Sequence, residues 1–126
     1  MACVLVVEDE PTIAMVLQEL LREAGHQVIT AHNGAEALQA LQATPCPDIM
    51  LLDLFLPDTT GRDLLQKARN LESFRDRPVV LITGAVPCPE DFPPEGAYQA
   101  LIAKPFELDE VLQTVARLVP SSPPGA

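Results

Sequence analysis

Five polar side chains stand at or next to the ends of predicted apolar strands of this sequence, and together they could carry out phosphoryl chemistry. They are Glu8, Asp9, Asp53, Thr83 and Lys104. Two carboxylates about 4 Å apart repel each other by about 4 kcal/mol at an effective dielectric near 20. A cluster of three therefore needs protons, a cation or a metal to compensate it. Carboxylate oxygens are ligands that Mg²⁺ prefers, and Mg²⁺ with Lys104 would balance the three negative charges. A carboxylate in such a site can act as a nucleophile and form an aspartyl phosphate.

Each of these residues also has an ordinary structural role to weigh against that chemistry. Glu8 and Asp9 precede a proline, so they would equally suit the positive end of a helix that starts there. Asp53 is more informative, because it lies within an apolar run, where an unpaired carboxylate is costly to bury. Thr83 and Lys104 on their own indicate no more than a strand-end hydroxyl and a surface charge. The chemical interpretation therefore depends on a fold that brings these residues together.

Five apolar segments of strand length alternate with segments in which apolar residues recur at helical spacing. Strands are predicted over residues 3–7, 27–31, 48–53, 78–83 and 100–103. Helices are predicted from Pro11 to about Gly25, from a capping box at Asn33 and Glu36 to about Ala43, around 64–71 and around 108–115. This alternation predicts an α/β fold with a doubly wound, five-stranded parallel sheet of order 2-1-3-4-5 and helices on both faces.

The segment between the fourth and fifth predicted strands fits this alternation poorly. A fourth helix is expected between residues 85 and 101, but prolines occupy positions 87, 89, 93 and 94. An interior proline removes a backbone donor and clashes with the preceding turn, at a cost of about 3 kcal/mol or more. We therefore expect the fourth helix to be short, displaced or partly unwound.

The predicted sheet would bring the five polar residues to one edge. In an open α/β sheet, ligands bind beyond the carboxyl ends of the strands, where the strand order reverses. The first and third strands flank that reversal, so Glu8, Asp9 and Asp53 are expected to be neighbours. Thr83 ends the fourth strand and Lys104 follows the fifth, at the same edge.

Composition limits the other functions open to this chain of 126 residues. The length suits one domain, which we expect at residues 1–119, followed by a flexible Pro- and Ser-rich tail at 120–126. Eight basic against 18 acidic side chains give a net charge of −10, so no direct contact with nucleic acid is expected. The sequence has neither an apolar run of membrane-spanning length nor a basic start typical of a secretory signal. Its three scattered cysteines suit a reducing compartment, and we expect a cytoplasmic protein without membrane association.

Motifs for several other chemistries are missing from the sequence. His26 and His32 have no Cys, Asp or Glu at metal-ligand spacing, so they are interpreted as structural. The glycine-rich motifs of dinucleotide-binding and P-loop proteins do not occur, and neither does the nucleophile elbow of serine hydrolases.

Four local motifs carry a resemblance to a known family. They are Val-Val-Glu-Asp-Glu at 6–10, Leu-Leu-Asp-Leu-Phe-Leu-Pro-Asp-Thr-Thr-Gly at 51–61, Leu-Ile-Thr-Gly-Ala at 81–85 and Lys-Pro-Phe at 104–106. In this order and at these separations the chain resembles the receiver domain of bacterial two-component response regulators, over roughly residues 2–119. The resemblance implies a flavodoxin-like fold, in agreement with the sheet predicted from the residue pattern.

The resemblance also implies a role for each acidic residue. Asp53 would accept a phosphoryl group from a histidine of a sensor kinase or from a small acyl phosphate. Glu8, Asp9 and Asp53 would hold Mg²⁺, together with the backbone carbonyl of Phe55.

Thr83 and Lys104 complete the implied catalytic set with Asp53. The hydroxyl of Thr83 would bond a phosphoryl oxygen, and Lys104 would be the basic partner in the site. Such a receiver is not an enzyme in the usual sense, although it catalyses its own phosphoryl transfer and the hydrolysis of its phosphoaspartate. The implied partners are a sensor histidine kinase or a histidine phosphotransfer protein, and a downstream protein of unknown identity. The interpretation also allows a phosphorylation-linked homodimer.

One position departs from the family pattern. The family usually has Tyr or Phe three residues before the lysine, where this chain has Leu101; Tyr98 lies six residues before it. With the prolines at 87–94, this indicates intact phosphorylation chemistry with an altered readout. The alternative function is a receiver-fold binding module that acts without phosphorylation. A phosphatase with an aspartyl nucleophile is disfavoured, because Phe55 stands where that class needs a second Asp.

Overall fold

The computed structural model describes residues 2–43, 46–84, 93 and 96–119. In these residues the chain forms a five-stranded parallel sheet of order β2-β1-β3-β4-β5. The strands are β1 (Cys3–Val7), β2 (Gln27–Ala31), β3 (Ile49–Asp53), β4 (Val79–Thr83) and β5 (Ala100–Ala103). The helices are α1 (Pro11–Glu23), α2 (Gly34–Gln42), α3 (Gly61–Arg69) and α4 (Leu108–Leu118). The predicted fold class and strand order are confirmed.

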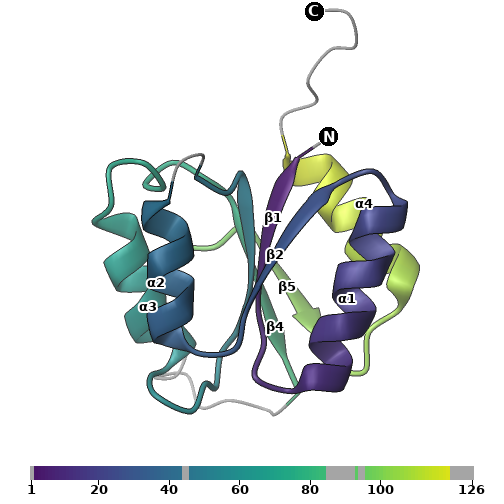
Figure 1. Ribbon diagram of the computed structural model, residues 1–126, viewed down its shortest axis with the longest axis horizontal. Coiled ribbons are helices and arrows are strands. Elements are labelled where there is room, and N and C mark those ends of the chain that lie inside the picture. Colours follow the sequence, from purple (N-terminus) through teal and green to yellow (C-terminus); the bar gives the residue numbers. More distant parts are fainter. Residues whose placement is uncertain (1, 44–45, 85–92, 94–95, 120–126) are drawn as a thin grey trace, which may run out of the picture.

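Helices cover both faces of the sheet, with α2 and α3 on one side and α1 and α4 on the other (Figure 1). Side chains of β1 alternate between the two cores: Leu5 and Val7 pack with α2 and α3, whereas Val4 and Val6 pack with α1 and α4. Every residue of β3 and β4 is buried. Strands covered on both faces are largely apolar, which explains why these two segments show no polar alternation before Asp53 and Thr83 at their ends.

Two strands begin one residue later than the sequence pattern predicted. Before β3, Asp48 bonds through both its backbone and its side chain: its N–H donates to the carbonyl of Cys3 at 2.8 Å, Oδ2 accepts the N–H of Cys3 at 2.9 Å, and Oδ1 pairs with Arg77 at 2.5 Å. Before β4, Pro78 has no N–H to donate, although its carbonyl accepts the N–H of Met50 at 3.2 Å. Both boundaries depend on contacts between residues far apart in the sequence.

The start of α2 carries the predicted cap with one difference. Asn33 Oδ1 accepts the N–H of Glu36 at 2.8 Å, as expected of an N-cap residue. Glu36 Oε1, however, accepts the N–H of His32 at 3.0 Å, one residue before the cap itself. The pair therefore satisfies two backbone donors around the helix start.

Two predictions concern segments outside the described residues. Most of the expected fourth helix lies there, because residues 85–92 and 94–95 are not described, and so does the expected tail at 120–126. Residues 96–99 are described, form no helix and lead directly into β5. Within the described ranges, no helix combines the length and the apolar character that crossing a membrane requires.

Candidate functional site

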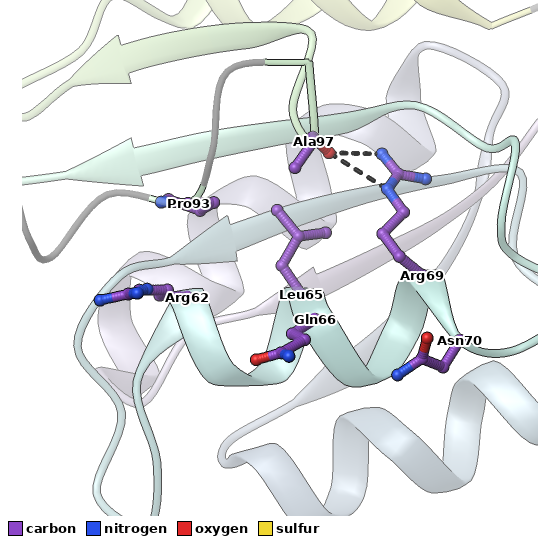
Figure 2. A pocket seen from close by; sticks show the side chains of 7 residues that line it. All are labelled: Arg62, Leu65, Gln66, Arg69, Asn70, Pro93 and Ala97. Atoms are coloured by element: carbon purple, nitrogen blue, oxygen red, sulfur yellow. Dashed lines mark hydrogen bonds between the residues drawn. The ribbon is translucent and has the colours of Figure 1, made fainter.

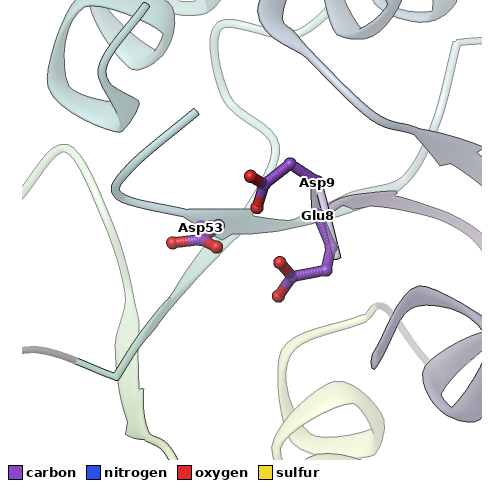
Figure 3. Close-up of side chains that lie close together, drawn as sticks. All are labelled: Glu8, Asp9 and Asp53. Carbon is purple, nitrogen blue, oxygen red and sulfur yellow. The ribbon is translucent and has the colours of Figure 1, made fainter. Parts of the chain in front are cut away.

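The carboxyl ends of β1 and β3 bring three acidic side chains together (Figure 3). The register pairs Val7 of β1 with Leu52 of β3, so the residues that follow them lie side by side. One carboxylate oxygen from each of Glu8, Asp9 and Asp53 lies within 4.8 Å of the other two. Glu8 and Asp53 are buried, whereas Asp9 is exposed. The structure thus places these three carboxylates as neighbours, as the predicted sheet order required.

Lys104 reaches the same cluster from the end of β5. Its Nζ lies 2.8 Å from Oε1 of Glu8 and 3.2 Å from Oδ2 of Asp53. Its backbone N–H donates to the carbonyl of Thr83 at 2.8 Å, which fixes the residue beside the end of β4. The peptide bond between Lys104 and Pro105 is cis. One ammonium group is therefore shared between two of the three acids.

Among the acids of the site, Glu8 has a pKa that the folded environment raises strongly. Its side chain is only 2% exposed. Burial raises the pKa of Glu8 to about 7; the hydrogen bond from Lys104 opposes this shift, and the neighbouring Asp53 adds to it. Burial lowers the pKa of Lys104, but its hydrogen bond with Glu8 and the charges of Asp53 and Glu8 outweigh this and raise that pKa above its usual value. Without a metal, the cluster holds more negative charge than one lysine compensates.

Both carboxylate oxygens of Asp53 have partners. Oδ2 accepts from Lys104, and Oδ1 accepts the backbone N–H of Phe55 at 3.1 Å. The backbone behind Asp53 is packed closely against the start of α3. A Cβ placed on Gly61 would lie 2.8 Å from the Cα of Leu54 and 2.9 Å from the carbonyl oxygen of Asp53. Only glycine permits this approach, so the carboxylate is held on a backbone with little freedom to shift.

Thr83 lies at the end of β4, between the strands that carry the aspartate and the lysine. The register sets Asp53 beside Ile82, and Thr83 beside Ala103. Thr83 is buried, with 5% of its surface exposed. The five residues predicted from the sequence therefore occupy the ends of four neighbouring strands.

The donor set fits a small divalent cation. Three carboxylate oxygens within 4.8 Å of one another are hard ligands of the kind that Mg²⁺ takes, usually with several waters retained. Two negative charges remain once Lys104 is counted, which matches the charge of such an ion. The backbone carbonyl of Phe55 stays a prediction as the fourth protein ligand.

The position that departs from the family pattern is on the surface. Leu101 pairs with Leu81 in the sheet and is 46% exposed. Tyr98 is half-buried and packs against the core between the sheet and the α2–α3 layer. Tyr98 therefore does not occupy the place of an aromatic residue at 101.

A cavity of about 320 Å³ lies beside α3, away from the acidic cluster (Figure 2). It is lined by Arg62, Leu65, Gln66, Arg69, Asn70, Pro93 and Ala97. The guanidinium of Arg69 donates to the carbonyl of Ala97 from Nε at 3.2 Å and from Nη2 at 2.5 Å. Its Nη1 donates to the carbonyls of Phe74, Arg75 and Arg77 at 3.3, 2.9 and 2.6 Å. This arginine is engaged with backbone, so the acidic cluster is the better candidate site.

Two side chains near the acidic cluster, those of Asp58 and His32, make contacts that were not anticipated from the sequence. Asp58 accepts the N–H groups of Gly34 and Ala35, at 2.7 and 3.1 Å. The Nδ1 of His32 lies 3.3 Å from the carbonyl oxygen of Glu8. These partners are 23 or 24 residues apart, so no local pattern could have revealed them.

Comparison with known proteins agrees with the motifs. The family model for the response regulator receiver domain matches residues 4–116. The transcriptional regulatory protein KdpE of Mycobacterium tuberculosis is 37% identical over 113 residues, which cover 89% of this chain and 48% of that protein. The polar-differentiation response regulator DivK of Brucella anthropi is 28% identical over 113 residues, covering 89% and 91%. The chain thus spans about half the length of the first relative and most of the second.

A solved structure of similar fold has been determined with ligands bound. It is the response regulator protein TrrA of Thermotoga maritima, in complex with Mg²⁺–BeF. The two chains are 31% identical and superpose with a TM-score of 0.82, over 94% of this chain and 100% of that one. The resemblance inferred from four short motifs is confirmed along nearly the whole chain.

Proposed function

The chain belongs to the response regulator receiver domain family, and we propose that it is a phosphorylation-dependent signalling receiver of a two-component system. In this proposal Asp53 accepts the phosphoryl group and the signal passes on through protein–protein contacts. The observation that supports it best is the pairing of Asp53 with Lys104, at 3.2 Å, inside a cluster of three carboxylates. Receivers are generally not enzymes in the usual sense, and we propose that this one catalyses only its own phosphoryl transfer and phosphoaspartate hydrolysis.

The proposed reaction uses a carboxylate oxygen of Asp53 as the nucleophile. This oxygen forms a bond to the phosphorus of a phosphohistidine or a small acyl phosphate. The bond from phosphorus to the donor's nitrogen or oxygen breaks, and its electron pair leaves with the donor. Lys104, already beside Oδ2, offsets the negative charge of the phosphoryl oxygens, and the hydroxyl of Thr83 donates to one of them.

Mg²⁺ is the proposed cofactor, held by Glu8, Asp9, Asp53 and the backbone carbonyl of Phe55. When bound, the ion supplies positive charge that stabilises the phosphoryl oxygens during transfer. The hard oxygen donors within 4.8 Å and the uncompensated charge support this assignment. The Mg²⁺–BeF complex of TrrA, a related chain of the same fold, supports it independently.

The proposed phosphodonor partner is a sensor histidine kinase or a histidine phosphotransfer protein. A groove of about 520 Å³ borders Lys104 and offers such a protein an apolar surface beside the site; it is lined by Ile13, Val16, Gly84, Lys104, Pro105, Phe106 and Leu108. The downstream partner is proposed to be a protein, since a net charge of −10 opposes direct contact with nucleic acid. A cytoplasmic location and a phosphorylation-linked homodimer remain part of the proposal.

The second candidate function is a binding module that keeps the fold without being phosphorylated. It is favoured by Leu101, which presents an exposed aliphatic side chain where the family usually has an aromatic one. The acidic cluster with its lysine opposes it, because a binding module has no need of buried like charges.

Thermal stabilisation by a phosphoryl mimic separates the two functions. With Mg²⁺ and beryllofluoride present, we expect the parent to melt at a higher temperature than with either alone. A ligand at 100 times its dissociation constant stabilises a protein by about 2.7 kcal/mol, which corresponds to roughly 10 °C for a domain of this size. Asp53→Asn should show no such shift.

Asp109→Asn is the matched control, because it makes the same change at an exposed aspartate in the first turn of α4. It should retain the full shift. NaCl at the ionic strength of the Mg²⁺ sample controls for screening of the net negative charge. A parent that shows no shift with both ligands would overturn the phosphorylation proposal and favour the binding module.

A further inference from the structure

The loop that follows Asp53, residues 54–60, is closed on itself by backbone contacts. The N–H of Leu56 donates to the carbonyl of Thr59 at 3.2 Å, and the N–H of Gly61 donates to the carbonyl of Leu54 at 2.7 Å. Phe55 and Thr60 form an isolated antiparallel bridge between these two bonds. A loop tied at its base and along its length moves as one unit, so a force on its tip is transmitted to Phe55.

Asp58, at the tip of this loop, is attached to a different element. Its Oδ1 accepts the N–H of Gly34 at 2.7 Å and its Oδ2 accepts the N–H of Ala35 at 3.1 Å. These are the first two residues of α2, where unpaired N–H groups and the helix dipole favour a negative charge. The bond from Gly34 is the main reason that the pKa of Asp58 lies below its usual value. The carboxylate is therefore ionised at neutral pH.

The same short segment before α2 also contacts the other half of the acidic cluster. The N–H of Glu8 donates to the carbonyl of Ala31 at 3.0 Å, and Nδ1 of His32 lies 3.3 Å from the carbonyl of Glu8. Residues 31–35 thus hold the backbone of Glu8 on one side and the loop after Asp53 on the other. β1 and β3 pair directly in the sheet, and this segment adds a second connection between the backbone of Glu8 and the loop that follows Asp53.

We propose that Asp58 is a positioning residue for the metal and phosphoryl site, which it sets through the loop rather than by touching the bound groups. This inference rests on the proposed function. By fixing the tip of the loop to α2, Asp58 fixes Phe55, whose N–H holds Oδ1 of Asp53 at 3.1 Å and whose carbonyl is the proposed fourth ligand. Because Asp58 is exposed, its hydrogen bonds with the N–H groups of Gly34 and Ala35 bury little surface. Their main effect is to fix the position of the loop relative to α2.

Mg²⁺ affinity of the full chain tests this proposal. Groups that orient a metal ligand typically change affinity by about 10- to 100-fold when removed. We expect Asp58→Ala to weaken Mg²⁺ binding by about tenfold in a calorimetric titration, at the low end because it acts through the backbone. Asp58→Asn keeps one acceptor oxygen for one of the two N–H groups, so its loss should be intermediate.

Asn33→Ala is the matched control. It removes another side-chain cap from the same helix start, since Asn33 Oδ1 accepts the N–H of Glu36, but it leaves the loop attached to α2. Both alanine variants should lower the melting temperature, whereas only Asp58→Ala should weaken Mg²⁺ binding. In the parent, added Mg²⁺ should shift the amide NMR signals of Gly34 and Ala35; in Asp58→Ala these signals should no longer respond.

The outcomes separate this inference from the function on which it rests. A parent that binds Mg²⁺ together with an Asp58→Ala variant of equal affinity overturns the positioning role alone. Equal losses of affinity in Asp58→Ala and Asn33→Ala also overturn it, because they show a general effect of the helix start. A parent that does not bind Mg²⁺ overturns the proposed function and this inference together.

Discussion

Glu8 is the residue whose chemistry depends most on its folded environment. An ordinary glutamate ionises near pH 4.5, whereas burial, with the adjacent Asp53 carboxylate, raises the pKa of Glu8 to about 7 despite its hydrogen bond from Lys104. Without metal, the folded protein keeps a proton on Glu8 over a pH range in which the unfolded chain has lost it. Because a metal binds the ionised carboxylate, proton and metal compete for the same oxygens.

We expect the metal-free protein to lose stability as the pH rises from 5 to 8. Between about pH 4.5 and 7 Glu8 binds more protons in the folded state than in the unfolded state, so its contribution to the free energy of unfolding falls as the pH increases. The part due to Glu8 is on the order of 2 kcal/mol. Urea unfolding in the presence of a chelator, at both ends of this range, measures it.

Glu8→Gln is the control for this prediction, because the amide keeps an acceptor oxygen for Lys104 and does not titrate. His26 acts in the opposite direction, since burial lowers its pKa. Its contribution is common to parent and variant and cancels in their difference. A variant that loses as much stability as the parent would show that the pH dependence arises elsewhere.

At the scale of elements, the site depends on how closely α3 starts behind β3. Gly61 is the first residue of α3, and its N–H donates to the carbonyl of Leu54 at 2.7 Å. The space around its Cα is bounded by the backbone of Asp53 and Leu54. Backbone atoms in a buried strand end cannot move aside as the tip of a side chain can, so helix and strand are fixed to each other here.

Gly61→Ala should destabilise the protein by about 2 kcal/mol, as expected for overpacking against backbone. Alanine favours the helical conformation more than glycine does, so a net loss must come from the new contact. Gly84→Ala is the matched control, because its Cβ would meet the flexible side chain of Lys104 at 3.2 Å. We expect it to lose less stability. Urea midpoints compare the two, and an equal loss would contradict the close-packing explanation.

At the scale of the whole molecule, Arg69 joins three segments that the sheet alone leaves separate. Its guanidinium links the end of α3 to carbonyls in residues 74–77 and to Ala97 and Gln99 ahead of β5. Gln99 in turn accepts the N–H of Val79 at the start of β4. Since residues 96–99 form no helix, this arginine supplies donors that local secondary structure does not.

Arg69→Lys should therefore be far from conservative. A lysine has one ammonium group, which cannot serve all four carbonyls that the guanidinium fork reaches. A carbonyl left unpaired away from water costs about 1–3 kcal/mol. We expect a loss of about 2–3 kcal/mol in the free energy of unfolding. Arg22→Lys, an exposed arginine in the last turn of α1, is the control and should change stability little. Equal stability of the two variants would contradict the proposed linking role.

Much of the fold could be predicted from patterns within single stretches of sequence. The bounds of β1, β2 and β5 agree with the prediction, because run length, valine and isoleucine content and flanking turn residues are local properties. The starts of β3 and β4 differ by one residue, since Asp48 and Pro78 are decided by partners on other strands. That Glu8, Asp9, Asp53, Thr83 and Lys104 gather at one edge of the sheet could also be predicted, since they stand at the ends of apolar runs and parallel strands end at one edge.

The tertiary structure alone decided how these residues act on one another. It set the sharing of Lys104 between Glu8 and Asp53, the raised pKa of Glu8 and the attachment of Asp58 to α2. Hydrogen bonds form only near 3 Å, and charge interactions strengthen as the separation shrinks. In this site those short distances arise between residues remote in the chain. Sequence pattern therefore determined which elements form and which side chains stand at their ends, whereas packing determined the charge and geometry of the site.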